Sequence, residues 1–512
     1  MLPVLSPAEA AALDRVSEAR GIRPDDLMEA AGRAVARATV AAAGGSYGRR
    51  AVAVCGKGNN GGDGLVAVRL LGRRGMGAVA VMASDPAALS GPAARSFHRF
   101  AAAGGRVVRL EGDALARELR RADVAVDALF GTGFRGAAEG AAAAAIEGLN
   151  AFAGPVVAAD VPSGVDGATG AVAGPAVRAA VTVTFGAMKP GLLFQPGAAH
   201  AGRIEVADIG FPPELVTGDL WLVQPSDVAG WLAPRPASAH KRSTGVVLIV
   251  AGSRAMTGAA VLTAMAAYRA GAGLVTLAAP PAVVEVAQRH LVEAVHLPLP
   301  QTEDGTVAEA GWEAVAERLG SVHAAAIGPG LTTNASTVAF VRRFVAGAPV
   351  PFVLDADGLN AFAASPEGLA RRRAPAVLTP HAGEFARLAG GTAAEAEADR
   401  AAAARRAAAA FDCALLLKGP ATVVAEPSGR AFVNPTGGPS LATGGTGDVL
   451  TGTVAAFLAR GLEPGPAAAA AAFVQGLAGD LAGEELGEGT TASDVAARLP
   501  AALAAVREAC GT

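Results

Sequence analysis

A glycine-rich segment that ends in an aspartate, residues 434–448, is the stretch of this sequence best suited to chemistry. Gly444, Gly445 and Gly447 leave the backbone free to curl with its N–H groups pointing inward. The apolar run that follows predicts a helix starting at or beside Asp448, so the positive end of that helix lies at the curl. Such an arrangement binds a phosphate or a developing oxyanion. A carboxylate would repel a resident phosphate, so we expect Asp448 to take a proton from an attacking hydroxyl. A simple helix N-cap in a glycine-rich loop is the structural alternative.

Three apolar segments in the first half of the chain predict buried strands that end in glycines and small polar groups. They cover 51–55, 124–130 and 156–160, and the polar segments after them are Gly56–Gly64, Gly131–Gly136 and Val161–Gly167. In an open parallel sheet such strand ends share one edge, where ligands bind. The spacing matches neither the Rossmann fingerprint nor a P-loop. Each aspartate there could instead cap a helix, so the prediction of a binding site depends on all three segments together.

The second half alternates apolar strands with helical segments in the same way. Strands are predicted at 246–250, 274–279, 324–327, 352–354, 376–378 and 414–417. The fold class is therefore α/β, with two domains that we place at 1–215 and 224–512, each built on a parallel sheet. We interpret the proline-rich stretch 211–244 as the connection between them. The alanine-rich segment 395–410 is expected to be a solvated helix.

The composition excludes several classes of protein. Among 512 residues, 52% are hydrophobic and 17% charged, which suits large buried cores. Forty-three basic and 46 acidic residues give a net charge of -3, so we expect neither a nucleic-acid partner nor a membrane surface. The three cysteines are scattered without metal-binding spacing, and the first residues lack the basic patch and apolar core expected of a signal peptide. These features predict a reduced, cytoplasmic setting.

The order of these motifs resembles the bifunctional NAD(P)H-hydrate repair enzymes, in which an NAD(P)HX epimerase domain is fused to an ADP-dependent NAD(P)HX dehydratase domain. In the first half the resemblance rests on Leu27–Gly32, Asn59–Gly64, Asp127–Gly136 and Asp160–Gly164. In the second half it rests on Gly252–Val275, Gly328–Gly330, Asp355–Asp357, Thr379–Glu384, Lys418–Thr422 and the Asp448 loop. The resemblance implies a Rossmann-like first domain and a ribokinase-like second domain.

The resemblance also implies ligand contacts in the first domain. The hydrated dinucleotide, NADHX or NADPHX, would contact Asn59, Asn60, Gly61, Gly62, Asp63, Gly131, Thr132, Gly133, Phe134, Arg135, Gly136, Ala137 and Asp160. A potassium ion would be held by Asn60, Asp127 and Ser163. Oxygen ligands of this kind suit a hard cation.

In the second domain the resemblance implies a hydrate site and a nucleotide site. The hydrate would contact Ala260, Gly330, His381 and Asp448. ADP would contact Lys418, Gly419, Pro420, Ala421, Thr422 and Gly447. Glu384 and the pair Asp355 and Asp357 would support magnesium, which needs few carboxylates beside phosphate and water. Two positions depart from the family pattern, since Met256 stands where an aromatic residue is usual and Ala30 replaces a common asparagine.

The implied chemistry is metabolite repair by an isomerase and a lyase. ADP would phosphorylate the C6 hydroxyl of the hydrated nicotinamide with Asp448 as base, and loss of phosphate would regenerate NADH or NADPH. Asp160 is the best acid/base candidate for interconverting the two epimers at C6. A ribokinase-like kinase for a hydroxymethyl-pyrimidine or sugar, with a non-catalytic nucleotide-binding first domain, is the alternative. We also expect a homo-oligomer.

Overall fold

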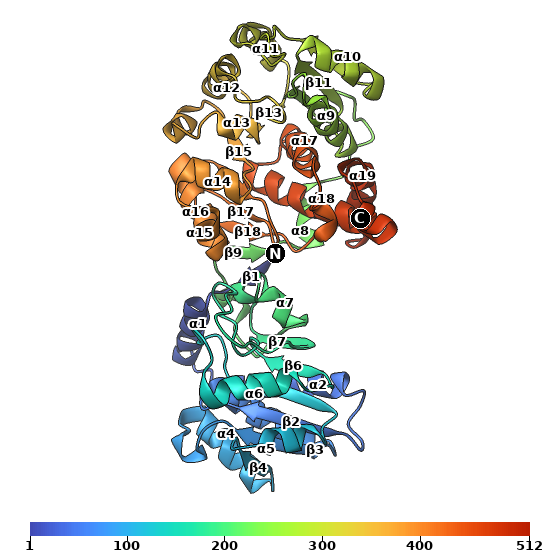
Figure 1. Ribbon diagram of the computed structural model, residues 1–512. Helices are drawn as coiled ribbons and strands as arrows, with labels where there is room; N and C mark the ends of the chain where they lie inside the picture. Colours follow the sequence, from blue (N-terminus) through green and yellow to red (C-terminus); the bar gives the residue numbers. More distant parts are fainter. Residues whose placement is uncertain (512) are drawn as a thin grey trace. The chain divides into compact units, whose positions relative to one another are not determined.

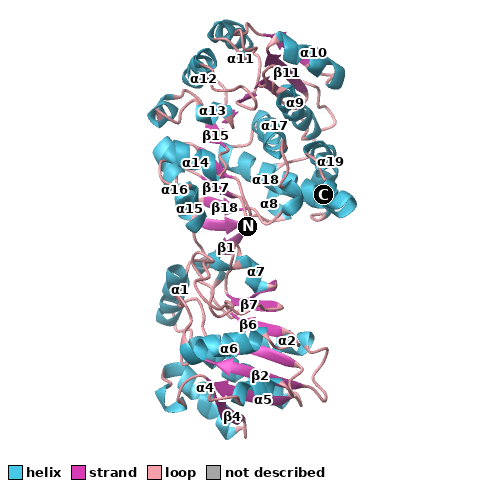
Figure 2. Cartoon of the chain, in the orientation of Figure 1, coloured by secondary structure: helices cyan, strands magenta, loops and turns pink. Residues whose placement is uncertain are grey.

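Two β-sheets, one in each half of the chain, position the predicted sites (Figure 1). The structure is a computed structural model that describes residues 1–511. It divides into one unit of Leu2–Gly218 and a second that begins at Asp219 and contains the rest of the described chain. Each unit has helices packed on its sheet, shown in cyan on magenta in Figure 2. The predicted α/β class with a largely parallel sheet in each half is confirmed.

The sheet of the first unit is entirely parallel. Its spatial order is β4 (Arg106–Arg109), β3 (Gly77–Met82), β2 (Arg50–Cys55), β5 (Val124–Ala128), β6 (Val156–Ala159), β7 (Val181–Phe185) and β8 (Arg203–Ala207). The chain order reverses between β2 and β5, which makes the carboxyl ends of these strands the expected place for a ligand.

Helices cover both faces of this sheet because the strands are apolar on both sides. Ala51, Ala53 and Cys55 of β2 belong to one buried cluster, whereas Val52 and Val54 belong to another. The helices are α1 (Pro7–Ala19), α2 (Pro24–Ala42), α3 (Asn59–Arg73), α4 (Gly91–Ala102), α5 (Ala114–Leu119), α6 (Gly140–Asn150) and α7 (Ala198–Ala201). Helix α1 begins with a capping box formed by Ser6 and Glu9.

The sheet of the second unit is parallel from β16 to β12, and β17 runs antiparallel to both of its neighbours. Its order is β9 (Leu220–Leu222), β18 (Ala431–Val433), β17 (Val423–Ala425), β16 (Ala414–Leu417), β15 (Ala376–Leu378), β14 (Phe352–Leu354), β13 (Ala324–Ile327), β10 (Val246–Val250), β11 (Leu274–Ala279) and β12 (Val295–Pro298). The helices are α8 (Pro225–Trp231), α9 (Thr257–Arg269), α10 (Pro281–His290), α11 (Trp312–Leu319), α12 (Ala335–Gly347), α13 (Asp357–Asn360), α14 (Ala382–Ala389), α15 (Ala393–Ala398), α16 (Arg400–Phe411), α17 (Thr446–Ala459), α18 (Pro464–Leu486) and α19 (Ala492–Glu508).

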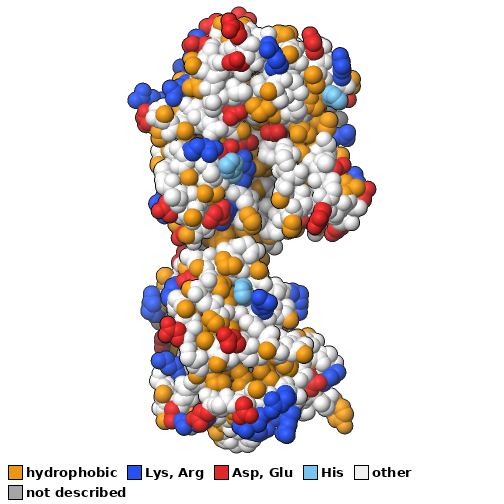
Figure 3. Space-filling view, in the orientation of Figure 1, with side chains coloured by type: hydrophobic (Ala, Val, Ile, Leu, Met, Phe, Trp, Pro, Cys, Tyr) orange, Lys and Arg blue, Asp and Glu red, His pale blue; other side chains and the backbone are white. Residues whose placement is uncertain are grey.

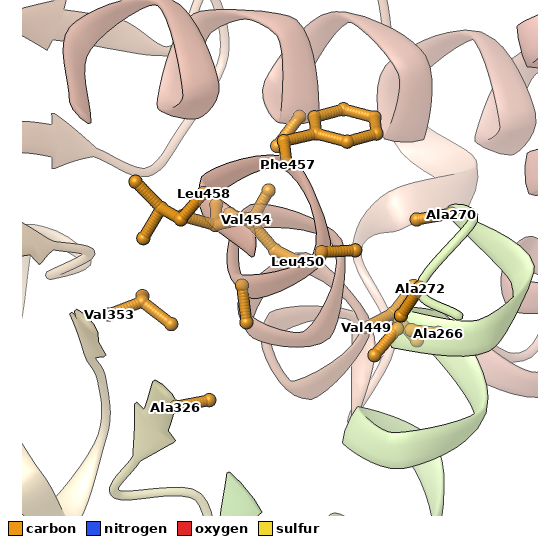
Figure 4. Close-up of a cluster of buried hydrophobic side chains, with 14 of the residues drawn as sticks. Ala266, Ala270, Ala272, Ala326, Val353, Val449, Leu450, Val454, Phe457 and Leu458 are labelled. Atoms are coloured by element: carbon orange, nitrogen blue, oxygen red, sulfur yellow. The ribbon is translucent and has the colours of Figure 1, made fainter. Parts of the chain in front are cut away.

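Helix α17, which follows the glycine-rich segment, is buried in the core of the second unit. Val449, Val454 and Phe457 are fully buried. Figure 4 shows α17 side chains among alanines of the α9 region, such as Ala266, and beside Val353 of β14. Burial of side chains of this size stabilises the helix by roughly 1.5–3 kcal/mol each. The start of α17 is therefore held in a fixed position relative to the strand ends.

The interpretation of the stretch 211–244 as a connection is wrong from Asp219 onward. This stretch contains strand β9, which pairs with β18, and helix α8. Val223, Val228 and Leu232 are buried in the same core as α17. The prolines do not mark a linker here, because Pro225 occupies the first position of α8, where its missing N–H costs nothing.

The expectation of a solvated helix at 395–410 is also wrong. The segment forms α15 and α16, which meet at Asp399. Ala404, Ala408 and Phe411 of α16 are buried. Alanine allows a helix to lie close to a sheet, so an alanine-rich pattern does not by itself indicate exposure.

Acidic and basic side chains are interspersed over much of the face shown in Figure 3. Among the helices of residues 1–511, none combines the length and the apolar character needed to cross a membrane.

Candidate active sites

A cavity of about 920 Å³ lies in the first unit, at the carboxyl ends of its strands. It is lined from the three segments predicted to meet there, by Asn59, Asn60, Asp63, Gly131, Thr132, Gly133, Phe134 and Asp160. Asp14, Lys57, Arg95 and Lys189 also line it. The structure therefore brings together most of the residues predicted for the first site.

The other predicted residues of this site lie behind or beside the cavity. A Cβ at Gly61 would collide with the carbonyl group of Gly56, and one at Gly62 would collide with Met28. These glycines allow α3 to start close to β2 and α2. Arg135 forms an ion pair of 3.3 Å with Asp166, and Gly136 and Ala137 follow it in the same loop.

Asp160 is held by several donors at the end of β6. Its Oδ1 atom lies 2.8 Å from Nζ of Lys189. The hydroxyl of Thr184 and the backbone N–H of Phe185 each donate to Oδ1 at 3.3 Å. Asp160 has a φ of 65°, a left-handed conformation that aspartate tolerates better than most residues. The strand end and its neighbours thus fix the carboxylate at the cavity.

Lys189 is a residue of this site that the sequence motifs do not identify. Its side chain is buried, and its ammonium group also donates to the carbonyl oxygen of Phe185 at 2.7 Å. The available signal is a lysine closely following an apolar strand, at the sheet edge that the aspartates share.

Asp127, Ser163 and Asn60 form one network beneath the cavity. The Ser163 hydroxyl donates to Asp127 Oδ1 at 2.6 Å, and the Ser163 N–H donates to Oδ2 at 2.7 Å. Burial raises the pKa of Asp127 to about 6, although the hydrogen bonds from Ser163 lower it. Asn60 donates to the carbonyl oxygen of Phe130 at 2.7 Å, and its buried Oδ1 accepts no hydrogen bond. The three residues predicted to hold a cation therefore do lie together.

The second site surrounds Asp448, in the first turn of α17. Gly445 precedes the helix with a φ of 92°, which a side chain would disfavour. Burial and, to a smaller extent, the negative charge of Asp355 raise the pKa of Asp448, Lys418 lowers it, and the net value is about 7. Such a carboxylate can accept a proton near neutral pH.

Lys418 links the acidic groups of this site. Its Nζ lies 2.8 Å from Asp355 Oδ1 and 3.6 Å from Glu384 Oε2. Burial lowers the pKa of Lys418, but Asp355 and Glu384 raise it to a net value above that of a free lysine. A Cβ at Gly447 would lie 3.5 Å from this ammonium group, so the lysine sits directly beside the glycine-rich loop.

The remaining predicted residues of the second site have mixed surroundings. His381 caps α14, because its Nδ1 accepts from the N–H groups of Gly383 and Glu384, and its ring is partly exposed. Ala260 is fully buried and packs against Gly252. Gly330 packs against Met256, and Gly419 packs against Arg400. Pro420 is exposed, while Ala421 and Thr422 are half-buried in the turn before β17.

Helix α18 fixes the glycine-rich segment through contacts that the sequence does not reveal. Gln475 donates to the carbonyl oxygen of Thr446 at 2.8 Å. Asp480 accepts from the N–H of Gly437 at 3.0 Å, and Thr436 donates to the carbonyl oxygen of Phe473 at 2.8 Å. These residues position the loop rather than line it.

Within residues 1–511, no three His, Cys, Asp or Glu side chains converge as a group able to hold a metal ion. This does not bear on the network at Asp127, which offers one carboxylate together with amide and hydroxyl oxygens.

Comparisons with known proteins match a separate family to each half of the chain. The NAD(P)H-hydrate dehydratase family matches residues 247–501, and the family described as YjeF-related protein N-terminus matches residues 24–191. The bifunctional NAD(P)H-hydrate repair enzyme Nnr of Moorella thermoacetica is 42% identical over 497 residues, covering 95% of this chain and 93% of that protein. The enzyme of the same name from Mycobacterium tuberculosis is 40% identical over 436 residues, covering 85% and 84%.

Solved structures resemble the second unit, among them that of a bacterial dehydratase. The ADP/ATP-dependent NAD(P)H-hydrate dehydratase of Bacillus subtilis, co-crystallised with ATP and Mg²⁺, superposes with a TM-score of 0.50 and 32% sequence identity. The match covers 57% of this chain and 100% of that one. Together with the matches along nearly the whole sequence, it confirms the predicted family and the dehydratase fold of the second unit. The chain belongs to the family of bifunctional NAD(P)H-hydrate repair enzymes, which combine an epimerase domain with a dehydratase domain.

Proposed function

We propose that the two units divide the repair of hydrated NADH and NADPH between Asp160 and Asp448. The first unit interconverts the R and S epimers of NAD(P)HX, with Asp160 exchanging the proton of the C6 hydroxyl. The second unit dehydrates the S epimer and converts ADP to AMP and phosphate, with Asp448 as the general base. The observation that carries the proposal is the position of Asp448 in the first turn of α17, with its pKa raised to about 7 by burial.

The dehydration begins with transfer of a phosphoryl group to the hydrate. Asp448 takes the C6 hydroxyl proton while the hydroxyl oxygen attacks the terminal phosphorus of ADP and AMP leaves. The N–H groups at the start of α17 and the ammonium group of Lys418 offset charge on the phosphoryl group. Loss of the phosphate from C6 and of a proton from C5 then yields NAD(P)H. Phosphate is a far better leaving group than hydroxide, which is why the nucleotide is needed.

Magnesium fits the second site by the chemistry of its donors. Asp355 and Glu384 lie within ion-pair distance of Lys418, and Asp357 is near enough to Asp448 to raise its pKa. These carboxylates do not converge on one point, so a magnesium ion would take most of its ligands from phosphate and water. When bound, magnesium would offset the negative charge of the ADP phosphates. The Bacillus subtilis dehydratase is an ADP/ATP-dependent enzyme, and we propose ADP as the phosphoryl donor of this chain.

Potassium fits the network beneath the first cavity. The Asn60 Oδ1 atom is buried without a donor, and Asp127 and Ser163 add further oxygens. A bound cation would satisfy the amide oxygen and would offset the buried charge of Asp127.

A small-molecule kinase is the alternative function for the second fold, and the family membership does not favour it. The products decide between the two. A kinase releases a stable phosphate ester, whereas the proposed reaction releases inorganic phosphate and a reduced nicotinamide that absorbs light.

The direct test is incubation of the purified chain with mixed hydrate epimers, potassium and magnesium, with either ADP or ATP. We expect reduced nicotinamide and inorganic phosphate in equal amounts, and AMP when ADP is the donor. A phosphorylated product that accumulates without reduced nicotinamide would reject the dehydratase assignment. Omission of the nucleotide is the control.

Two further proposals concern the setting of the protein. Cys55, Cys413 and Cys510 are all free thiols, which supports a reducing compartment such as the cytoplasm. The homo-oligomer stays a prediction, and sedimentation of the purified chain tests it.

A further inference from the structure

Two carboxyl groups that line the first cavity, those of Asp160 and Asp63, differ in whether they have hydrogen-bond donors beside them. Asp160 receives three donors on one oxygen atom, from Lys189, Thr184 and Phe185. Asp63, near the start of α3, also lines the cavity and is 7% exposed. Its side chain receives no hydrogen bond and forms no ion pair with any residue of the described chain 1–511.

These surroundings favour different protonation states. Asp160 has a positive charge and two further donors within reach, which suits a group that accepts a proton from substrate. Burial raises the pKa of Asp63 well above its usual value, and the negative charges of Asp160 and Asp14 raise it further. A buried carboxyl without a partner favours its neutral form, which carries a proton that it can donate.

The other charged groups around the cavity leave Asp63 without a counter-charge. Lys189 is engaged with Asp160, and Arg95 forms a 2.7 Å ion pair with Asp25. Lys57 is exposed in the loop before α3, and Asp14 is exposed on α1. Lys189, Arg95 and Lys57 form no ion pair with Asp63 in the part of the chain that the structure describes.

We propose that Asp63 is the second proton-transfer residue of the epimerase site, donating a proton where Asp160 accepts one. The proposal rests on the role of Asp160 proposed above. Lys189 is then a positioning residue, because its ion pair with Asp160 places a positive charge beside that carboxyl and none beside Asp63.

The pair suits epimerisation by opening and closing of the hydrated ring. Asp160 takes the proton of the C6 hydroxyl, the C6–N1 bond breaks, and its electron pair goes to N1. Asp63 gives its proton to N1, and C6 becomes an aldehyde. Rotation about the C5–C6 bond turns the other face of the aldehyde toward N1. Closure returns the N1 proton to Asp63 and the Asp160 proton to the oxygen, so every atom is conserved and both carboxyls regain their starting states.

The test uses the full chain and one pure hydrate epimer without nucleotide, and follows formation of the other epimer by chromatography. For Asp63→Asn we expect kcat to fall by about 10²–10⁴-fold, as for loss of a general acid, with KM nearly unchanged. Asp63→Glu, which keeps a proton donor, should recover part of that loss. Asp113→Asn removes an exposed carboxyl of the same unit that does not line the cavity, and it is the matched control, with an expected change of about threefold or less.

The outcomes separate this proposal from the role of Asp160. An unchanged kcat with a raised KM in Asp63→Asn would show that Asp63 only binds the substrate, and would overturn the proposal while Asp160→Asn stays inactive. Activity in Asp160→Asn would overturn the proposed role of Asp160 and the paired mechanism with it. Hydrogen exchange of peptides from Leu2–Gly218 checks folding. If Asp63→Asn is unfolded, Asp63→Glu decides, because a folded Glu variant without activity contradicts a proton-donor role.

The role of Lys189 has its own readout. Lys189→Met should move the acidic limb of the epimerisation pH profile to higher pH, because Asp160 loses its positive neighbour. Lys189→Arg, which keeps the positive charge, should return the acidic limb to its wild-type position. If the acidic limb of the pH–rate profile stays at the wild-type pH in a folded Lys189→Met variant, the lysine is only structural.

Discussion

The ammonium group of Lys418 lies 2.8 Å from Oδ1 of Asp355, and the hydroxyl of Thr451 donates to the other oxygen of Asp355 at 2.7 Å. Thr451 belongs to α17 and Lys418 follows β16, so Asp355 ties the helix of Asp448 to the loop where we propose that the nucleotide binds. This arrangement places a positive charge beside Gly447 and a negative charge near Asp448. The two charges act in opposite directions on Asp448, and burial is the larger influence.

The pH dependence of dehydration follows from that environment. With the pKa of Asp448 near 7, kcat should fall about tenfold per pH unit below that value, because the protonated carboxyl cannot accept the hydroxyl proton. Above it the rate should level off. Steady-state dehydration of the pure S epimer between pH 5 and 8.5 measures this, and a flat profile through pH 6 would argue against Asp448 as the base.

Asp448→Asn should lower kcat of dehydration by about 10²–10⁴-fold and leave epimerisation intact. Asn keeps the shape of the side chain but cannot take up a proton. Asp480→Asn is the matched control, because Asp480 touches the same glycine-rich segment only through the N–H of Gly437. Its effect should stay within about tenfold, as expected for one hydrogen bond. If kcat falls equally in the two variants, the loss of any carboxylate that contacts the loop lowers activity, and Asp448 has no special role as the base.

Potassium should stabilise the first unit if Asn60, Asp127 and Ser163 hold it. A ligand at 100 times its Kd adds about 2.7 kcal/mol to the free energy of unfolding. The unfolding temperature of the first unit, followed by hydrogen exchange or calorimetry, should therefore be higher in potassium chloride than in choline chloride of equal ionic strength. Asn60→Ala should abolish that difference in unfolding temperature. If the wild-type chain unfolds at the same temperature in both salts, potassium does not bind at this network.

The two halves should be separable, but the boundary matters. A fragment that starts at Asp219 keeps β9, whose Leu220 and Leu222 are buried against β18. A fragment that starts at Gln224, the boundary that the sequence pattern indicates, lacks this strand. Loss of two buried leucines costs roughly 3–6 kcal/mol, so the shorter fragment should unfold at a clearly lower denaturant concentration. Equal stability of the two fragments would show that β9 is dispensable.

Local sequence patterns locate the strand ends and the glycine-rich loop because both are set by neighbouring residues. The ends of β2, β5 and β6 need only apolar runs followed by glycine and polar groups. By contrast, Lys189, Asp14 and Gln475 come from segments without a recognisable motif. Their positions depend on how β7, α1 and α18 pack, and a sequence pattern does not contain that information. The buried face of α16 escapes prediction for the same reason.

The measurement that tests the division of labour most directly is the progress curve of the full chain on mixed hydrate epimers with ADP. The wild-type chain should convert both epimers in one continuous phase, because epimerisation keeps supplying the S epimer. Asp160→Asn should consume the S epimer quickly and leave the R epimer to slow spontaneous conversion, giving a fast phase and a slow remainder. Asp448→Asn should show no fast phase although its epimers still interconvert. If Asp160→Asn consumes both epimers at the wild-type rate, Asp160 is not the proton-transfer group, and the proposed division between the two units is wrong.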